Sequence, residues 1–378
     1  IIYFIYWKGV GKMVTTRRRK EVYIRKLIRL GKVSSAVVLP KSWIETQNLR
    51  PGDQVYIRER EDGVLEISPA IMPMENLRRQ VFIIYADKVT DSELLKRLII
   101  GAYTQGLINI RVARSDLDFL PNNIIELIHK LTSRFDEVYI KRELRNLVDI
   151  EVIHSEAEIN INEKIAEMFM HLYSEIEHLA RALETKERKH LEEVLKIEEL
   201  IDRYYYKLLR RIILIQRGRL PAEKHGLESI LHVIGNRRII GIIEMISDLT
   251  AEIAKELMEE SIEMFDERIL NGIKALLDAI RKTIPDTIRA FSPPDFMLAH
   301  NVLQRLGRLE MALKNFRKNI KKIVTDVKKA VYLVSIITKL VDATRLFTGI
   351  CEVIINRAIE NPEQLGANVF ELISAQEE

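Results

Sequence analysis

A helical spacing of apolar residues begins near Asn162 and persists almost to the end of this 378-residue chain. Apolar side chains recur every three or four residues, which places them on one face of an α-helix. Residues 218–226 and the Ser-Pro-Pro stretch at 292–294 interrupt the pattern. The spacing therefore predicts long helices in two groups of three, that is, two tandem three-helix bundles. The first two stripes comprise Ile165, Met168, Leu172, Ile176, Leu179 and Leu183, then Leu191, Leu195, Leu200, Leu208 and Ile212. The later helices are predicted over 227–260, 269–289, 298–321 and 324–359.

Residues 71–157 have a mixed strand and helix pattern. We predict strands over 81–85, 108–113, 137–141 and 147–153, and helices over 91–104 and 121–133. The order βαβαββ is typical of a small α+β layer domain, and the first helix permits parallel pairing of the first two strands. Because the segment contains no recognisable catalytic motif, we expect a spacer, dimerisation or small-ligand domain.

Residues 17–70 form a small basic module. Between Arg17 and Lys32 the chain has eight Lys or Arg residues and one acid, Glu21, whereas the net charge of the whole chain is only +4. A polyanion partner is the simplest reason for such a local concentration of positive charge, and the module is of a kind that binds DNA.

The pattern within this module indicates strands and turns. We predict a strand over 21–30 that ends at Gly31, and a hairpin whose turn is Glu61-Asp62-Gly63, because Asp-Gly is a strong hairpin signal. A short helix is predicted over 41–47 with Trp43 and Ile44 buried.

The N-terminal extension, residues 1–16, begins with an apolar stretch. Residues 1–12 are too few to span a bilayer and lack the basic n-region of a signal peptide. We expect them to precede a natural start at Met13, the alternative being an arm that packs on a partner. We expect a cytoplasmic protein without membrane insertion. Cys351 is the only cysteine, which excludes an intramolecular disulfide and a cysteine zinc cluster and fits a reducing interior.

No Ser/His/Asp or Cys/His arrangement, glycine-rich phosphate loop or HExxH motif has a recognisable spacing. We therefore expect no enzymatic activity. His171 and His178 could share a helix face, but we interpret each histidine as an ordinary helix residue.

Two pairs of acids stand four residues apart, Glu198 with Asp202 and Glu244 with Asp248. Like charges at this spacing destabilise a helix by about 0.2–0.5 kcal/mol, and a carboxylate among apolar residues is costly unless a cation or a donor meets it. Two such pairs on adjacent helices would form an oxygen site for a divalent metal. The alternative is a solvated helix edge.

The segments SSAVVLPKSWIE, LRPGDQVYI and GVLEIS resemble the AbrB/SpoVT swapped-hairpin family of DNA-binding domains. The resemblance implies that residues 17–70 dimerise by interleaving strands and place basic side chains against DNA, with strongly salt-dependent phosphate contacts. The implied DNA-binding residues are Arg25, Lys26, Arg29, Lys32 and Lys41, with Arg17, Arg18, Arg19 and Lys20 as a basic arm.

The repeated acid pair, with EMISD at 244–248, resembles the marker of the PhoU family of phosphate-homeostasis regulators. The resemblance implies helical bundles at 158–263 and 264–378, and an iron or zinc site on Glu198, Asp202, Glu244 and Asp248. In the second bundle one acid of each pair is replaced, by Leu306 and Thr338. The remaining acids, Glu310 and Asp342, are weaker candidates.

The fused order resembles archaeal PhoU-type transcriptional regulators. It implies a multidomain fold: a swapped-hairpin β module, an α+β spacer and two tandem all-α bundles. The expected function is DNA-binding regulation of phosphate uptake by a homodimer whose bundles sense or relay phosphate status. One alternative is an adaptor that docks on a phosphate transporter subunit or a signalling kinase without binding DNA. A metal-dependent hydrolase is the least favoured.

Overall fold

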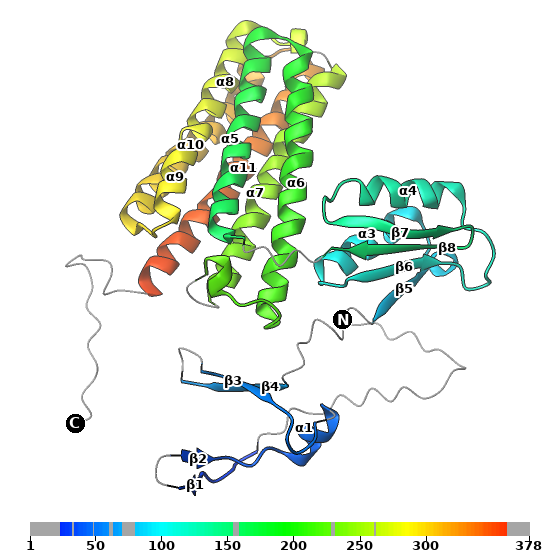
Figure 1. Cartoon of the computed structure of the whole chain (residues 1–378). Helices are drawn as coiled ribbons and strands as arrows, with labels where there is room; N and C mark the ends of the chain where they lie inside the picture. Colours follow the sequence, from blue (N-terminus) through cyan, green and yellow to red (C-terminus); the bar gives the residue numbers. More distant parts are fainter. Residues whose placement is uncertain are drawn as a thin grey trace, which may run out of the picture. The chain divides into compact units, whose positions relative to one another are not determined.

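The computed structural model describes residues 23–31, 34–47, 49–59, 63–69, 80–153, 159–227, 231–260 and 262–360. The chain divides into two compact units, Ile1–Glu75 and Asn76–Glu378 (Figure 1). Several sequence predictions fall outside the described residues, namely those for residues 1–16, Arg17, Arg18, Arg19, Lys20, Lys32 and the Glu61-Asp62 part of the turn.

The first unit contains two hairpins separated by a short helix. β1 (Ile28–Leu30) pairs antiparallel with β2 (Ser34–Ala36), and β3 (Val55–Glu59) pairs antiparallel with β4 (Leu65–Pro69). Gly63, at φ 73°, adopts the left-handed conformation that glycine tolerates best, and the predicted second hairpin is confirmed. The helix α1 (Lys41–Thr46) begins after Pro40.

The described part of the first unit has no buried residue. The prediction that Trp43 and Ile44 are buried is therefore wrong: both stay partly exposed, because one copy of the module supplies no second layer to cover them. The predicted strand over 21–30 is also too long, since only Ile28–Leu30 pair with β2. The exposed large apolar side chains are Tyr23, Ile24, Leu27, Ile28, Leu30, Val37, Val38, Tyr56, Ile57, Val64 and Leu65.

The second unit begins with the predicted α+β domain. Its sheet has the order β5-β6-β8-β7, formed by β5 (Val81–Tyr85), β6 (Asn109–Ala113), β7 (Val138–Leu144) and β8 (Leu147–Val152). The first two strands are parallel, as predicted, and the other pairs are antiparallel. The helices α3 (Ser92–Thr104) and α4 (Asn122–Thr132) share one buried core with this sheet.

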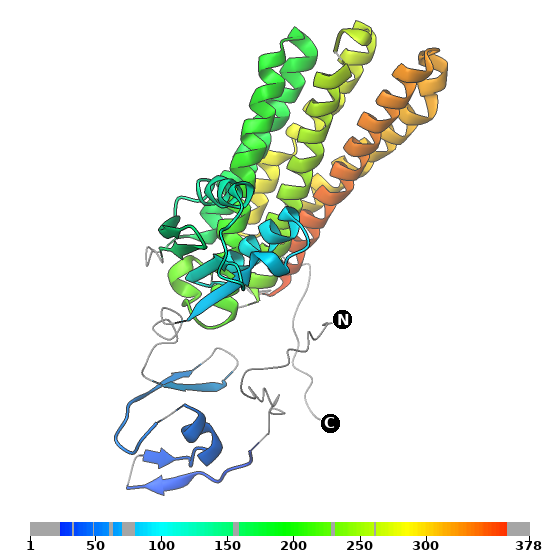
Figure 2. The same cartoon turned by 90° about the vertical axis from the view of Figure 1, so that its right-hand side faces the viewer.

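The helical region follows, and most of its helices are long rods that lie side by side (Figures 1 and 2). The helices are α5 (Ile161–Thr185), α6 (Arg188–Gln216), α7 (His232–Glu260), α8 (Glu267–Arg281), α9 (Ile284–Phe291), α10 (Phe296–Ile323) and α11 (Val327–Glu360). The stripe predicted on α5 is entirely buried, whereas Leu195 and Leu200 of α6 are only partly buried. No helix among the described residues has a stretch apolar and long enough to cross a membrane.

The two bundles share one continuous core. α5, α6 and α7 form the first bundle, and α8 to α11 form the second, with α7 against α11 and α5 against α8. Phe169 of α5 lies between Phe291 and Phe347, with both pairs of ring centroids 6.4 Å apart. This aromatic cluster fixes the two bundles against each other.

Two of the predicted helices differ most from those observed. The helix predicted over 269–289 is two helices, because Pro285 lacks a backbone N–H and the chain breaks at Lys282-Thr283 before it. The helix predicted from 227 begins at His232.

Candidate metal centre and nucleic-acid surface

The helices α6 and α7 bring three of the four predicted metal-binding acids together. One carboxylate oxygen from each of Glu198, Asp202 and Asp248 lies within 4.8 Å of the other two. The i,i+4 spacing on α6 points its two acids to one side, and α7 packs alongside. Glu244 lies outside this group of three. We call Glu198, Asp202, Asp248 and Glu244 the acid cluster.

Burial raises the pKa of every member of the acid cluster, and the charges of other members add to the rise for Glu198, Glu244 and Asp248. Desolvation is the largest cause for each residue. The pKa of Glu244 is raised to about 7 by burial and then by the charges of Asp248, Asp202 and Glu198. Four acids whose negative charge is this unfavourable form a place where a cation would be stabilised.

A fifth carboxylate, Glu175 of α5, lies beneath the acid cluster. Its side chain is completely buried, and its pKa is raised well above the usual range by burial and by the charges of Glu198 and Asp248. Ser247 Oγ donates a hydrogen bond to Glu175 Oε2 over 2.7 Å, but Glu175 Oε1 has no partner among the described residues. An unpartnered buried oxygen of this kind is an acceptor that a cation or a hydrogen-bond donor would satisfy.

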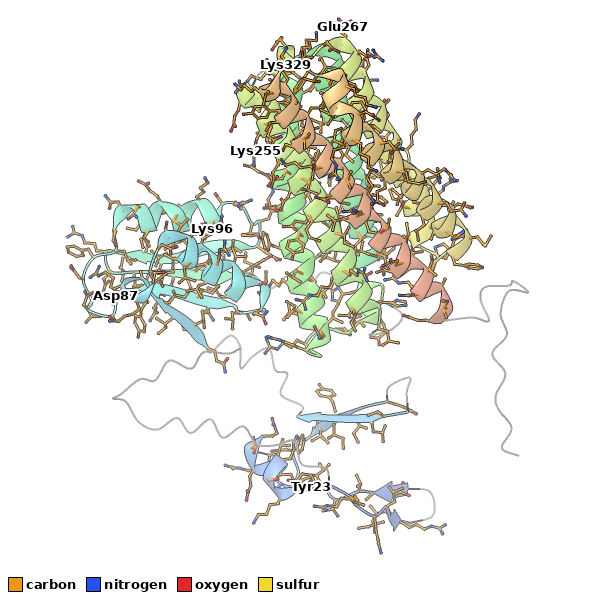
Figure 3. All side chains as sticks on the ribbon, turned by 180° about the vertical axis from the view of Figure 1, so that it is seen from behind. Tyr23, Asp87, Lys96, Lys255, Glu267 and Lys329 are labelled. Atoms are coloured by element: carbon orange, nitrogen blue, oxygen red, sulfur yellow. The ribbon has the colours of Figure 1, made fainter. Side chains whose placement is uncertain are left out.

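The α+β domain supplies a cation to the acid cluster. Arg134, which follows α4, places Nη2 3.1 Å from Asp202 Oδ2, and its positive charge partly offsets the rise in the pKa of Asp202. Lys96 of α3 and Lys255 of α7, both labelled in Figure 3, act in the same direction on Asp202 and Glu198 respectively. The acid cluster is therefore only partly neutralised by side chains.

Contacts farther along α6 fix the α+β domain in this position. Arg210 Nη1 donates to the carbonyl oxygens of Tyr103 and Leu107, and its guanidinium lies 5.0 Å from the centroid of the Tyr103 ring. Phe135, next to Arg134, stacks on Tyr103 at 4.7 Å and meets Tyr206 edge-on at 6.1 Å. Arg134, the ion-pair partner of Asp202, is thus the sequence neighbour of a residue in this aromatic contact.

A groove of about 1090 Å³ between α7 and α11 reaches one member of the acid cluster, Asp248. Asp248 lines it, together with Glu252, Asp342 and Arg345. A metal site needs such an entry path for the ion.

The second bundle differs in its electrostatics. Arg345 Nε lies 2.7 Å from Glu310 Oε1, Arg345 Nη1 lies 3.6 Å from Asp342 Oδ1, and Lys314 also pairs with Glu310. These cations lower the pKa of Glu310, opposite to the shift in the acid cluster. Leu306 is fully buried in the core. Glu310 and Asp342 are therefore joined through an arginine and need no metal for charge balance.

The residues of the first bundle fit a divalent cation. Three converging carboxylate oxygens suit a hard or borderline metal, and the unpartnered Glu175 oxygen adds acceptor capacity. Sequence analysis missed Glu175. The available signal was its position three residues after Leu172, where an acid interrupts the apolar stripe of α5. It also missed Arg134, because Arg134 and Asp202 are too far apart in the sequence for a local pattern to pair them.

The predicted DNA-binding residues within the described part of the chain are exposed. Arg25, Lys26 and Arg29 lie on and before β1, and among the described residues no acid forms an ion pair with them. Lys41 is also exposed, and its Nζ lies 3.7 Å from Glu45 Oε1. Because Arg29 pairs with Ser35, one face of this hairpin is polar, whereas Ile28 and Leu30 point to the other face.

Comparison with known proteins identifies two parts of the chain. Residues 165–257 match the family model of the PhoU domain, and this range contains the whole acid cluster. Residues 28–73 match the model of antidote-toxin recognition MazE, a bacterial antitoxin. Two segments of the chain are thus similar to a MazE-type antitoxin module and to the PhoU domain, in the order that the sequence resemblance indicated.

One solved structure similar to this chain is that of the phosphate transport system regulatory protein PhoU from Streptococcus pneumoniae. The two share 14% sequence identity with a TM-score of 0.46, over 53% of this chain and 94% of the other. No curated protein matches the chain.

Proposed function

We propose that this protein is a DNA-binding transcription regulator of phosphate uptake and homeostasis. In this proposal the MazE/AbrB-like module binds the operator, and the PhoU-like bundles sense or relay phosphate status. The observation that carries the proposal is the pairing of a PhoU domain with a separate module whose basic side chains Arg25, Lys26 and Arg29 are exposed and free of acid partners among the described residues.

A homodimer is the form of the protein that would bind DNA. An isolated two-stranded hairpin is marginally stable in water, yet each first unit has two such hairpins and no buried residue in its described part. Ile57 is 63% exposed and pairs with Ile67 on one face of its hairpin. A second copy that covers these apolar faces would supply the missing core and leave the basic face of β1 outward.

The acid cluster would be the regulatory end of the protein. We propose that Glu198, Asp202 and Asp248 hold an iron or zinc ion, with Glu244 at the rim and Glu175 beneath. The ion would neutralise the negative charge of these acids, which Arg134 neutralises only in part. The α+β domain would then respond to occupancy, because Arg134 belongs to it and Asp202 belongs to the bundle.

A gel-shift titration against genomic fragments at several salt concentrations tests the DNA assignment. A regulator should retard specific fragments with a steep salt dependence, because each phosphate contact contributes about −0.9 to the slope of log K against log salt. An adaptor that uses its N-terminal module only for dimerisation would retard none. Binding of a transporter subunit without any DNA binding would replace the proposal with the adaptor function.

A further inference from the structure

A pair of histidines near the turn between α5 and α6 has the geometry of metal ligands. His178 lies near the end of α5 and His190 lies in the first turn of α6. Their Nδ1 atoms are 3.2 Å apart, and their ring centroids are 5.4 Å apart with the planes inclined by 40°. Two imidazole nitrogens on one tetrahedral zinc ion, each at about 2.0–2.1 Å, are separated by about 3.3–3.4 Å.

A carboxylate lies near the second ring nitrogen of His190, although the same oxygen, Glu187 Oε2, also pairs with Lys189 Nζ over 2.8 Å. This second nitrogen of His190, Nε2, lies 3.5 Å from Glu187 Oε2, and the His190 side chain is only 12% exposed. A ligating histidine usually directs its other ring nitrogen to a carboxylate, which fixes the ring and makes the ligating nitrogen more basic. Glu187 therefore leaves His190 Nδ1 free to face His178.

A third candidate ligand follows on α6. Glu193 stands one turn after His190, and its charge acts on both imidazoles. It pairs with Lys196 over 2.6 Å, and its side chain is 42% exposed, so rotation towards the histidines requires only a surface ion pair to open. The positive end of the α6 dipole opposes a cation here, and the charges of Glu187 and Glu193 offset it.

We propose that His178, His190 and Glu193 form a binding site for a borderline divalent metal such as zinc, separate from the acid cluster. Imidazole and carboxylate ligands suit zinc, nickel and copper. An ion held by both helices would close the α5–α6 turn, so it would stabilise the first bundle at this end. This site does not depend on the proposed regulatory function.

Copper(II) EPR of the untagged, chelator-treated full chain tests the site. One equivalent of Cu²⁺ is added to the variant Glu198→Gln/Asp202→Asn/Asp248→Asn, in which the oxygen site is removed. The expected spectrum has nitrogen hyperfine structure from two imidazoles, and the two-nitrogen pattern disappears in a version that also has His178→Asn. His171→Asn, on the same helix, is the matched control and should keep the pattern.

Zinc binding by the wild-type chain gives a second measurement that remains valid if the triple variant fails to fold. We expect Zn²⁺ affinity at one of two sites to fall at least about 10-fold in Glu187→Gln, because a residue that orients a ligand is removed. A simple hydrogen bond between the two histidines predicts no two-nitrogen spectrum in any variant. That result, or a two-nitrogen spectrum that survives His178→Asn, would overturn the proposal.

Discussion

Arg134 and Asp202 join two parts of the second unit through an ion pair of 3.1 Å between Nη2 and Oδ2. Arg134 comes from the α+β domain and Asp202 from the acid cluster on α6, and both side chains are mostly shielded from solvent. A cation at the acid cluster and the Arg134 guanidinium would compete for the same carboxylate. This relationship links the state of the cluster to the position of the α+β domain.

Removal of the guanidinium should therefore favour cation binding. In Arg134→Ala we expect the affinity for Zn²⁺ or Fe²⁺ to increase by about 3- to 10-fold, which corresponds to about 1 kcal/mol for a half-buried pair. Calorimetric titration measures the change. Arg97→Ala, which removes an exposed arginine paired with Glu93, is the control and should leave affinity unchanged. Equal or weaker binding in Arg134→Ala would show that the two cations do not compete.

The raised pKa of Glu244 predicts a pH-dependent stability. The folded-state pKa is about 7 and the usual value is 4.5, so the folded state binds the proton more tightly than the unfolded state. The free energy of unfolding should then fall as pH rises from about 4.5 to 7. With divalent metal chelated, Glu244→Gln should stabilise the protein at pH 8 by on the order of 1 kcal/mol, once the solvent that reaches this half-buried group is allowed for.

Chemical denaturation at pH 4.5 and pH 8 distinguishes this effect from a general effect of the substitution. At pH 4.5 the variant and the wild type should have nearly equal free energies of unfolding. Glu259→Gln, at an exposed position of the same helix, should change neither value. A stabilisation of Glu244→Gln that is the same at both pH values would contradict the electrostatic cause.

The buried hydrogen bond between Ser247 and Glu175 should be important to the stability of the first bundle. Ser247→Ala leaves a second oxygen of Glu175 without a partner, which should cost about 1–3 kcal/mol. Replacing both residues, as Glu175→Leu/Ser247→Ala, should recover part of that loss, because no buried polar group then remains unpaired. A double-mutant cycle measured by denaturant unfolding gives the coupling. If the losses of unfolding free energy in the two single variants simply add in the double variant, the two residues are not coupled.

The exposed apolar faces of the first unit predict self-association. We expect the protein to elute with twice the 44.0 kDa mass of one chain in light-scattering chromatography. Ile57→Asp should shift it towards the monomer, because a charge would then be buried between the copies. Met311→Asp, at a similarly exposed position of α10, should leave the dimer intact. If the wild-type protein elutes as a monomer, no second copy covers the exposed apolar faces and the proposed dimer is contradicted.

Sequence alone predicted the parts of the fold that depend on local periodicity. The stripe on α5 and the parallel pair β5-β6 follow from the spacing of apolar residues and from the helix between the strands. The break before Pro285 was missed because the apolar spacing continues across it. The exposure of Trp43 was missed because burial was inferred from residue type, whereas a core needs a covering layer.

The acid cluster was partly predictable. The i,i+4 spacing showed which two acids share a helix face, and it identified Glu198, Asp202 and Asp248 before α6 and α7 were placed together. Contacts between segments that are far apart in the sequence leave no comparable spacing pattern. The pairing of Arg134 with Asp202 and of His178 with His190 depends on how the helices and the α+β domain pack.

DNA binding by the full-length protein in fluorescence anisotropy tests the central claim most directly. Wild-type protein should bind a promoter fragment with steep salt dependence. In Arg25→Ala/Lys26→Ala/Arg29→Ala the slope should fall by about 0.9 for each phosphate that the variant no longer neutralises, with at least about 10-fold weaker binding. Lys318→Ala/Lys322→Ala on α10 should behave as wild type. Duplex binding that does not change when the three N-terminal cations are removed, or no duplex binding at all, would contradict the assignment of a DNA-binding regulator.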